Sequence, residues 1–244
     1  MQVYGLIGYP VHHSFSKQFF TAKFDKEKTD AVFKLFSLKD ISEFPELIAA
    51  EKNLYGLSVT IPYKESIITY LDTLSGAAAD IHAVNCIKIS GNILTGYNTD
   101  VSGFERSFTP LLQKHHTAAL ILGSGGSSKA VQYVLKKLGL EFLIVTRHAD
   151  ENKAHISYSR IDKELVSRYP VIINCTPAGM FPDIDEFPQL PYQYLSSKNY
   201  LFDLIYNPVQ TKFLEKGLQQ GAVIKNGYEM LISQAEESWR IWTE

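Results

Sequence analysis

The sequence has few cysteines, no long apolar run and almost no net charge, and each shortage argues against a class of protein. Only Cys86 and Cys175 occur among 244 residues, each within an apolar run, so we expect buried thiols in a reducing cytoplasm rather than a disulfide scaffold. No stretch approaches the roughly 18 apolar residues that cross a membrane, and the first residues do not resemble a signal peptide. The formal net charge of −2 gives no electrostatic reason to expect nucleic acid or an anionic membrane as a partner.

The seven histidines show no spacing that is typical of metal ligands. The two adjacent pairs, His12–His13 and His115–His116, direct neighbouring side chains apart, so we expect no metal site. A small anionic ligand remains compatible with the composition, provided that a local basic pocket holds it.

The remaining composition is that of a globular protein, with 45% hydrophobic and 20% charged residues. Short β-rich runs alternate with longer helical patterns, which is typical of α/β architecture. In the first half we expect helices near 15–26, 40–52, 64–82 and 101–114, a hairpin turn at "SGN", and strands at Val3–Ile7, Ala31–Leu38, Leu57–Ile61, Ala83–Ile89 and Ile93–Tyr97. In the second half we expect helices near 127–138 and 228–242, a loop at 177–191, and strands at 118–122, 141–146, 171–176 and 200–206. The pattern predicts two α/β lobes with a border near residues 100–115, and a last helix that returns to the first lobe.

The clearest local signal is the segment "ALILGSGGSSKAVQYVLKKLGLEFLIVTR", in which a buried strand runs through a glycine loop into a helix and then into a second strand. This β-α-β arrangement brings a pyrophosphate against backbone amides at a helix N-terminus. Gly123 would allow the tight turn and Gly125 the close approach of a phosphate, while Ser128 stands where the dinucleotide-binding motif has its third glycine. The alternative is a glycine turn that joins strand to helix in an α/β domain without a ligand.

The end of the second strand of this unit indicates which dinucleotide binds. NAD sites usually carry an acid there, which binds the ribose hydroxyls. Here the strand ends with Thr146, Arg147 and His148, and no acid follows until Asp150. A guanidinium binds a 2′-phosphate in a forked geometry, so the sequence favours NADP over NAD. The alternative for Arg147 is a solvated arginine after a strand.

Polar side chains also follow several predicted strands of the first lobe, where open α/β sheets bind their ligands. They are Ser14, Ser16, Thr60, Lys64, Asn85 and the segment from Asn98 to Asp100. Hydroxyls, amides, an amine and a carboxylate at one sheet edge predict a pocket for a small, oxygen-rich ligand.

Eight segments together resemble one known family. They are "GYPVHHSFSK", "SVTIPYK", "AVNCI", "GYNTDVSGF", "GSGGSSKAV", "INCTPAGM", "DLIYNP" and "NGYEMLISQA", in that family's order and over nearly the whole chain. The chain is therefore similar to the shikimate dehydrogenases, which reduce 3-dehydroshikimate to shikimate with NADPH. The resemblance implies a substrate-binding catalytic domain at 1–104, completed by a C-terminal helix at about 226–244, and a Rossmann-like NADP-binding domain at 105–225. It also implies a cytoplasmic enzyme of aromatic amino acid biosynthesis that acts on a small molecule as a monomer or homodimer.

The resemblance carries functional positions onto this sequence motif by motif. Lys64 and Asp100 match the catalytic pair of the family. In that pair the lysine gives a proton to the ketone oxygen, and the aspartate orients the lysine amine. Ser14 and Ser16 would bind the substrate carboxylate, since hydroxyls at i and i+2 of an extended loop face the same way. The residues implied for the rest of the substrate are Thr60, Asn85, Tyr206 and Gln234. The residues implied for the cofactor are Gly123, Ser124, Gly125, Gly126, Ser127, Thr146, Arg147, Thr176 and Gly227.

Four positions depart from the family pattern. Ser58 and Thr146 replace asparagines, and Lys17 replaces a common proline. The second basic residue expected after Arg147 falls on the acidic pair at 150–151 unless the alignment slips to Lys153. NADP stays favoured over NAD.

Each functional assignment has an ordinary structural alternative. Lys64 could be a solvated lysine at the end of a strand, and Asp100 a helix N-cap. Asn85 could tie the backbone at a strand bend, Gln234 could lie on a helix surface, and Tyr206 could be a packing aromatic. The alternative functions are a quinate/shikimate dehydrogenase with relaxed cofactor choice, a non-catalytic paralogue that binds shikimate or NADP, and a relative of methylenetetrahydrofolate dehydrogenase.

Overall fold

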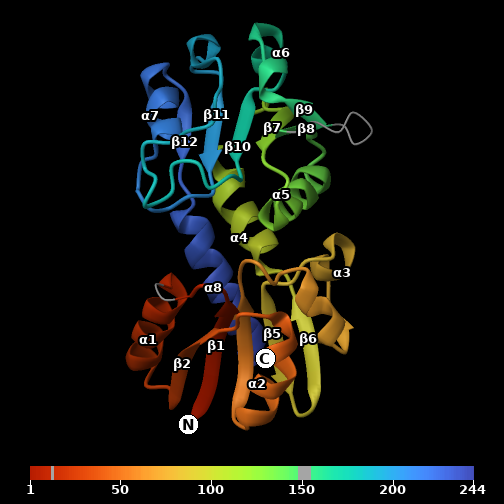
Figure 1. The fold of residues 1–244 in the computed structure, drawn as a ribbon. Helices are drawn as coiled ribbons and strands as arrows, with labels where there is room; N and C mark the ends of the chain where they lie inside the picture. The colour runs from red at the N-terminus through yellow and green to blue at the C-terminus, as the bar shows by residue number, and fades with distance from the viewer. Residues whose placement is uncertain (12–13, 148–154) are drawn as a thin grey trace. The chain divides into compact units, whose positions relative to one another are not determined.

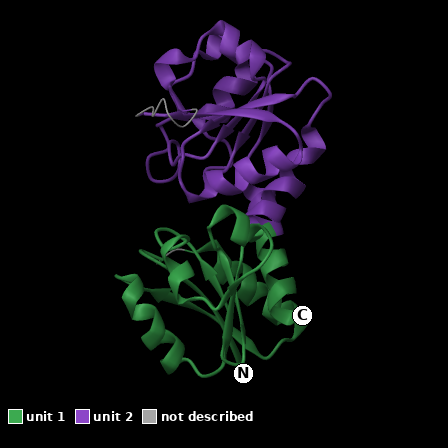
Figure 2. Cartoon of the chain, turned by 90° about the vertical axis from the view of Figure 1, so that its right-hand side faces the viewer, with its two compact units in different colours: residues 1–99, 234–244 green, residues 100–233 purple. Residues whose placement is uncertain are grey.

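The computed structural model describes residues 1–11, 14–147 and 155–244, which divide into two compact units. Unit 1 consists of residues 1–99 and 234–244, and unit 2 consists of residues 100–233 (Figure 2). Each unit is built around its own six-stranded sheet (Figure 1). The predicted α/β class with two lobes is confirmed.

Unit 1 carries a mixed sheet in the order β2-β1-β3-β5-β6-β4. Its strands are β1 Gln2–Gly8, β2 Ala31–Ser37, β3 Leu54–Val59, β4 Thr73–Leu74, β5 Cys86–Ser90 and β6 Ile93–Tyr97. Strand β1 runs parallel to β2 and β3, whereas β5 is antiparallel to both β3 and β6. Its helices are α1 Phe15–Glu27, α2 Phe44–Ala50, α3 Ala77–Ile81 and the last part of α8 Tyr228–Thr243. The expected hairpin is present, because Ser90 pairs with Ile93 and Gly91 has the positive φ of 61° that favours glycine.

Two tryptophans hold the end of α8 against the sheet of unit 1. Trp242 is 5% exposed, and its indole Nε1 donates to the carbonyl oxygen of Ile87 over 3.0 Å. Its ring fills the place that a side chain on Gly56 would need, so glycine lets the helix pack closely on β3. The rings of Trp239 and Trp242 lie 5.3 and 5.2 Å from that of Tyr4. Burial of each large side chain stabilises this packing by about 1.5–3 kcal/mol.

Unit 2 carries an all-parallel sheet in the order β12-β11-β10-β7-β8-β9. Its strands are β7 Ala118–Leu122, β8 Glu141–Thr146, β9 His155–Ser157, β10 Val171–Asn174, β11 Tyr200–Asp203 and β12 Val223–Lys225. Its helices are α4 Thr99–Phe108, α5 Gly126–Lys137, α6 Lys163–Arg168, α7 Lys212–Gln219 and the first part of α8. Counted from β7, this is the strand order of the doubly wound dinucleotide-binding fold, which reverses between β7 and β10. Ligands of such sheets bind beyond the carboxyl ends of the strands at that reversal.

The predicted helix at 64–82 is wrong. The segment forms a turn, a 3₁₀ helix at Ser66–Tyr70, strand β4 and helix α3. Asp72 decides this outcome: its N–H donates to the carbonyl oxygen of Leu94 over 3.0 Å, and its carboxylate accepts from the N–H of Leu94 over 2.7 Å. These bonds fix the segment beside β6 as a strand, and Gly76, with φ of 54°, separates it from α3.

Other elements differ in their limits or were not predicted. Strand β3 ends at Val59 instead of Ile61, and α4 ends at Phe108 instead of 114. Pro110, within the 3₁₀ helix Thr109–Leu111, lacks the N–H that would continue α4. The elements that the sequence did not indicate are β9, α6, α7 and β12.

Both cysteines are unpaired. Cys86 is buried, and burial raises the pKa of its thiol to about 12, so it stays protonated at neutral pH. Cys175 is partly exposed at the end of β10. Among the described residues, no helix is long and apolar enough to cross a membrane.

Candidate active site

The glycine loop connects β7 to α5 at the carboxyl end of the sheet. Gly123 has φ of 97°, which favours glycine, and a Cβ there would lie 2.9 Å from the methyl group of Thr176. Gly125 is the N-cap of α5, and no side chain caps this helix. A Cβ on Gly125 would meet no described atom within 4 Å, so packing inside the protein does not require glycine there. The exposed backbone of Ser124 and Gly125, followed by a helix N-terminus, is the arrangement that binds phosphate.

The serine that replaces the third glycine is used inside the protein. Ser128 is completely buried, and its hydroxyl donates to the carbonyl oxygen of Gly125 over 2.7 Å. Its N–H donates to the same oxygen over 2.9 Å. The hydroxyl therefore closes the first turn of α5 instead of pointing out to a ligand. Gly126 and Ser127, the other predicted loop residues, form that first turn and are partly exposed.

The loop after β10 lies against the glycine loop. The N–H of Cys175 donates to the carbonyl oxygen of Leu122 over 2.9 Å, and the methyl group of Thr176 faces Gly123. Asn174 fixes Thr176, because its side-chain oxygen accepts from the N–H of Thr176 over 3.0 Å and from its hydroxyl over 2.6 Å. Since the strand order reverses between β7 and β10, both loops border the expected ligand crevice.

The end of β8 carries the basic residue that was predicted for the 2′-phosphate. Thr146 is the last residue of β8, and Arg147 follows with an exposed side chain. Arg147 lies close to Tyr158: burial raises the pKa of that phenol, and the guanidinium charge lowers it. An exposed guanidinium at this position can bind a phosphate in a forked geometry. The second basic position, at 150–151 or Lys153, lies outside the described residues.

Two further predicted residues follow the last strands of unit 2. Tyr206, after β11, is half-buried, and burial raises the pKa of its phenol. Gly227 precedes α8 and donates its N–H to the carbonyl oxygen of Ile205 over 3.0 Å. A Cβ on Gly227 would overlap the carbonyl group of Leu204, so the contact between these two segments requires glycine. Gly227 therefore has a packing role, and its contact with a cofactor stays a prediction.

In unit 1, Ser14 and Ser16 stand at the N-terminus of α1. Ser14 is the N-cap, with an extended backbone and a side chain that makes no capping hydrogen bond. The prediction of an extended loop is wrong for Ser16, because α1 begins at Phe15. The first turn holds no acid, so two hydroxyls and a helix N-terminus favour an anion such as a carboxylate.

Thr60 and Lys64 lie in the segment that follows β3. The N–H of Thr60 donates to a β1 carbonyl oxygen over 2.9 Å, which places Thr60 at the carboxyl end of that strand. The carbonyl oxygen of Lys64 accepts from the N–H of Val84 over 2.7 Å. The preceding residue, Tyr63, is buried and donates its hydroxyl to the carbonyl oxygen of Leu38 over 2.7 Å. The backbone at Lys64 is thus held on both sides, and its side chain is half-buried rather than fully solvated.

Asn85 and Gln234 meet in a buried hydrogen-bond network around Thr99. Asn85 is 4% exposed and Thr99 is 1% exposed. The side-chain oxygen of Asn85 accepts from the N–H of Thr99 over 2.6 Å, and its Nδ2 donates to the Thr99 hydroxyl over 3.0 Å. The Gln234 Oε1 lies 3.4 Å from the Thr99 Oγ1 and 3.5 Å from the Asn85 Nδ2. The hydroxyl of Ser238 completes the network, 3.1 Å from the Thr99 Oγ1.

The sequence assigned no role to Ser238, and it included Thr99 only within the polar segment from Asn98 to Asp100. Thr99 had no role of its own in that prediction. It stands within the motif "GYNTDVSGF", but a threonine before an aspartate carries no pattern of its own. The following residue, Asp100, is 7% exposed and lies second in α4, so it is not the N-cap. The first turn of a helix favours its negative charge. Lys64 belongs to unit 1 and Asp100 to unit 2, so their catalytic pairing stays a prediction.

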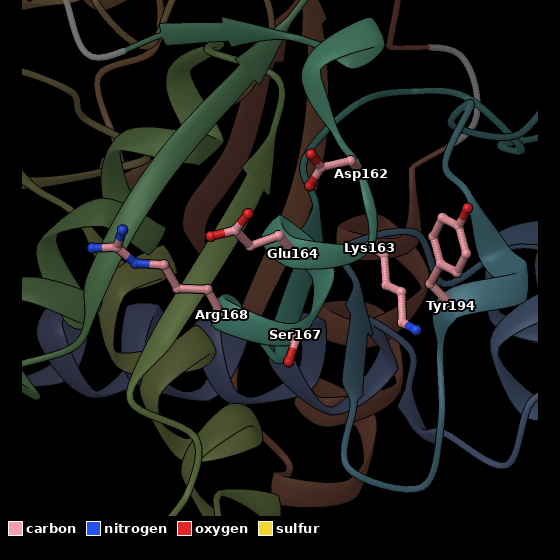
Figure 3. Close-up of a pocket in the computed structure, with 6 residues that line it drawn as sticks. All are labelled: Asp162, Lys163, Glu164, Ser167, Arg168 and Tyr194. Atoms are coloured by element: carbon pink, nitrogen blue, oxygen red, sulfur yellow. The ribbon is translucent and has the colours of Figure 1, made fainter.

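A separate hollow in unit 2 contains none of the predicted residues. It is lined by Asp162, Lys163, Glu164, Ser167, Arg168 and Tyr194 (Figure 3). Acidic and basic side chains are balanced in this lining, so it does not favour an ionic ligand of either sign.

The chain is similar to known proteins over almost its whole length. Residues 6–87 match the shikimate dehydrogenase substrate binding domain. The shikimate dehydrogenase (NADP(+)) of Caldanaerobacter subterraneus subsp. tengcongensis is 34% identical over 262 residues, which cover 99% of this chain and 91% of that protein. A solved shikimate dehydrogenase in complex with NADP+ has a TM-score of 0.88 at 31% identity, over 100% of this chain and 90% of that one. Shikimate 5-dehydrogenase from Thermus thermophilus, in complex with NADP(H) and shikimate, has a TM-score of 0.87 at 26% identity, over 100% and 94%. As its motifs predicted, the chain belongs to the shikimate dehydrogenase family.

Proposed function

We propose that the protein is an NADP-dependent shikimate dehydrogenase, which reversibly reduces 3-dehydroshikimate to shikimate in aromatic amino acid biosynthesis. The observation that carries this proposal is the similarity to NADP-dependent shikimate dehydrogenases over almost the whole chain. The glycine loop at the reversal point of unit 2 supports it independently of that similarity.

The two binding tasks divide between two domains. Residues 1–104 with a helix from about 226 to 244 bind the substrate, and residues 105–225 bind NADP. The match of residues 6–87 to a substrate binding domain supports the first assignment. The all-parallel doubly wound sheet of unit 2 supports the second.

NADPH, when bound, supplies the hydride. The backbone of Ser124 and Gly125 and the N-terminus of α5 hold its pyrophosphate, as the open space at Gly125 permits. Arg147 binds the 2′-phosphate, and the end of β8 carries no acid that would repel it. Thr146, Thr176 and Gly227 border the same edge of the sheet.

The residues of unit 1 bind the substrate and move one proton. Ser14 and Ser16 bind the carboxylate at the N-terminus of α1, Thr60, Asn85 and Gln234 bind hydroxyls, and Tyr206 contributes a further contact to the substrate. As the ketone carbon accepts a hydride, its oxygen gains negative charge. The Lys64 ammonium donates a proton to that oxygen and becomes a neutral amine, which solvent reprotonates. Asp100 orients the lysine.

A steady-state assay of shikimate and quinate with NADP+ and NAD+ tests the proposal. We expect shikimate-dependent reduction of NADP+, and Lys64→Ala should lower kcat about 10²–10⁴-fold, as is typical of acid–base groups, with NADP+ affinity unchanged. A protein that binds NADP+ but never reduces it with shikimate would be a non-catalytic paralogue. Rates with quinate or NAD+ that equal those with shikimate and NADP+ would instead identify an enzyme with relaxed selectivity for substrate or cofactor.

Cofactor choice has its own test at Arg147. Arg147→Ala removes a charge-assisted contact, so the KM for NADP+ should rise about 10–100-fold while the KM for NAD+ stays the same. Arg168→Ala, which removes an exposed arginine elsewhere in unit 2, is the matched control. An equal rise for both cofactors would contradict the role of Arg147 at the 2′-phosphate.

The proposal also covers where the enzyme works and how many copies assemble. Both cysteines are unpaired, which supports a place in the reducing cytoplasm. Sedimentation of the purified protein decides whether it is a monomer or a homodimer.

A further inference from the structure

Asp203, the last residue of β11, is a completely buried carboxylate that bonds to three separate segments. Its Oδ1 accepts from the side-chain amide of Asn174 over 3.0 Å and from the N–H of Ile205 over 3.1 Å. Its Oδ2 accepts from the hydroxyl of Thr211 over 2.6 Å. These donors belong to the end of β10, the turn after β11 and the N-cap of α7. No ion pair among the described residues includes Asp203, so hydrogen bonds alone hold its charge.

The bond to Asn174 leads to the glycine loop. The other side-chain atom of Asn174, its oxygen, accepts from both the N–H and the hydroxyl of Thr176. The methyl group of Thr176 in turn faces Gly123, at the start of the loop. Through two side chains, Asp203 thus fixes the segment that borders the glycine loop.

The bond to Ile205 leads to the start of α8. The carbonyl oxygen of Ile205 accepts from the N–H of Gly227 over 3.0 Å. The neighbouring carbonyl group of Leu204 occupies the space where Gly227 would carry a side chain. Tyr206 is the next residue along the chain. The same carboxylate therefore orders the turn that supports Gly227 and Tyr206.

A contribution to fold stability does not explain why this residue is an acid. Burial raises the pKa of Asp203 to about 6, although the bonds from Thr211, Ile205 and Asn174 lower it. A carboxyl whose folded pKa lies above its ordinary value of 3.8 lowers the free energy of unfolding, and this loss is complete above about pH 6. An asparagine of the same shape would avoid that loss.

We infer that Asp203 is a positioning residue of the NADP site, whose carboxylate holds the Asn174–Thr176 turn and the Leu204–Tyr206 turn in the arrangement that binds the cofactor. The inference rests on the proposed function. Burial and, to a smaller extent, the charge of Asp203 raise the pKa of the Cys175 thiol and of the Tyr192 phenol, so both groups stay protonated near neutral pH.

Equilibrium binding of NADP+, followed by calorimetry at pH 8, tests this role. Asp203→Ala leaves three buried donors without an acceptor and should weaken binding about tenfold or more. Asp203→Asn keeps an oxygen for Asn174 and Ile205, but it loses the charge and the acceptor for the Thr211 hydroxyl. It also avoids the cost of a buried charge, so it should weaken binding several-fold while the urea midpoint stays close to that of the wild type. Asp183→Asn, which removes an exposed carboxylate from the loop after β10, is the matched control and should bind as the wild type does.

The pH dependence of binding separates positioning from a purely structural role. Protonation of Asp203 should weaken NADP+ binding by the wild type below about pH 6, and Asp203→Asn should lack this component. The 2′-phosphate of NADP+ also titrates near pH 6, but it contributes equally to both proteins. The difference between the two pH profiles therefore reports Asp203 alone.

A second variant covers the case in which Asp203 variants do not fold. Thr211→Val removes one donor that keeps the carboxylate charged, so the loss of NADP+ binding at low pH should shift to higher pH. The inference would be overturned if Asp203→Asn bound NADP+ with wild-type affinity at pH 8 and with the wild-type dependence on pH. It would also be overturned if the dependence of NADP+ binding on pH did not shift in Thr211→Val. A wild-type protein that does not bind NADP+ at all would instead overturn the proposed function.

Discussion

Replacement of Thr99 by valine tests whether the buried network of unit 1 positions the Asn85 and Gln234 amides, which are proposed to bind the substrate. Valine has the shape of threonine but no hydroxyl, and Thr99 is 1% exposed, so no water can replace the lost group without a rearrangement. The hydroxyl lies 3.0 Å from Asn85 Nδ2, 3.4 Å from Gln234 Oε1 and 3.1 Å from the Ser238 hydroxyl.

The geometry fixes the expected size of the effect. Ser238 keeps its bond to the carbonyl oxygen of Gln234, at 2.8 Å, and so loses little. The Asn85 Nδ2 loses its 3.0 Å bond to the Thr99 hydroxyl, and its contact with the Gln234 Oε1 is longer, at 3.5 Å. Since one buried hydrogen bond contributes about 0.5–1.5 kcal/mol, the free energy of unfolding should fall by about 1 kcal/mol. If the orientation of the two amides costs a further 1.4 kcal/mol or so, the KM for shikimate should rise about tenfold.

Urea unfolding and steady-state kinetics measure both effects. The KM for shikimate should rise while kcat falls less, because the variant leaves Lys64 in place. Thr95→Val is the matched control, since the Thr95 hydroxyl contacts Thr73 over 3.0 Å on an exposed part of the same unit. A wild-type KM in Thr99→Val, with no more loss of stability than in Thr95→Val, would refute the positioning role.

Three further predictions concern the space around two glycines and the dependence of stability on pH. Gly227→Ala should destabilise unit 2 in urea, because its methyl group would overlap the carbonyl group of Leu204. A methyl group on Gly125 would enter open space, so Gly125→Ala should leave the urea midpoint nearly unchanged. It should weaken NADP+ binding at least about tenfold in calorimetry, and wild-type affinity would count against the phosphate site. His116 is 5% exposed, its Nδ1 accepts from the N–H of Gln113 over 3.0 Å, and burial lowers its pKa. The neutral ring is favoured in the fold, so stability should fall as pH drops below about 6.5, and His116→Asn should remove that component from urea midpoints measured between pH 5 and 8.

The second lobe was predictable where local patterns alone decide the structure. The buried run of β7, the glycines after it and the apolar spacing of α5 are all visible within one β-α-β segment. The segment 64–82 was not predictable in the same way. Ile67, Leu71 and Leu74 recur at nearly helical spacing, but the two bonds between Asp72 and Leu94, 22 residues further along, make part of it a strand. Those bonds exist only once the sheet has formed.

The residues of the candidate site also divide into those that local sequence predicts and those that depend on distant segments. Motifs identify positions at a helix N-terminus or a strand end, such as Ser14 and Arg147, because local sequence decides where these elements begin and end. They do not identify Thr99 or Asp203, whose partners come from distant segments. The Thr99 and Ser238 hydroxyls lie 139 positions apart in the sequence and meet only through the return of α8 to unit 1.

Buried polar residues such as Thr99 and Asp203 can fix the orientation of the side chains beside a binding site. Apolar packing fills space but does not decide which way an amide points, whereas a hydrogen bond away from water does. Thr99 restrains Asn85 and Gln234 in this way, and Asp203 restrains Asn174 and thereby Thr176. Because such a residue contributes direction as well as stability, conservative changes at Thr99 and Asp203 should lose more ligand affinity, for the same loss in free energy of unfolding, than changes at purely structural positions. The ratio of the two effects therefore distinguishes a positioning role from a structural one at both residues.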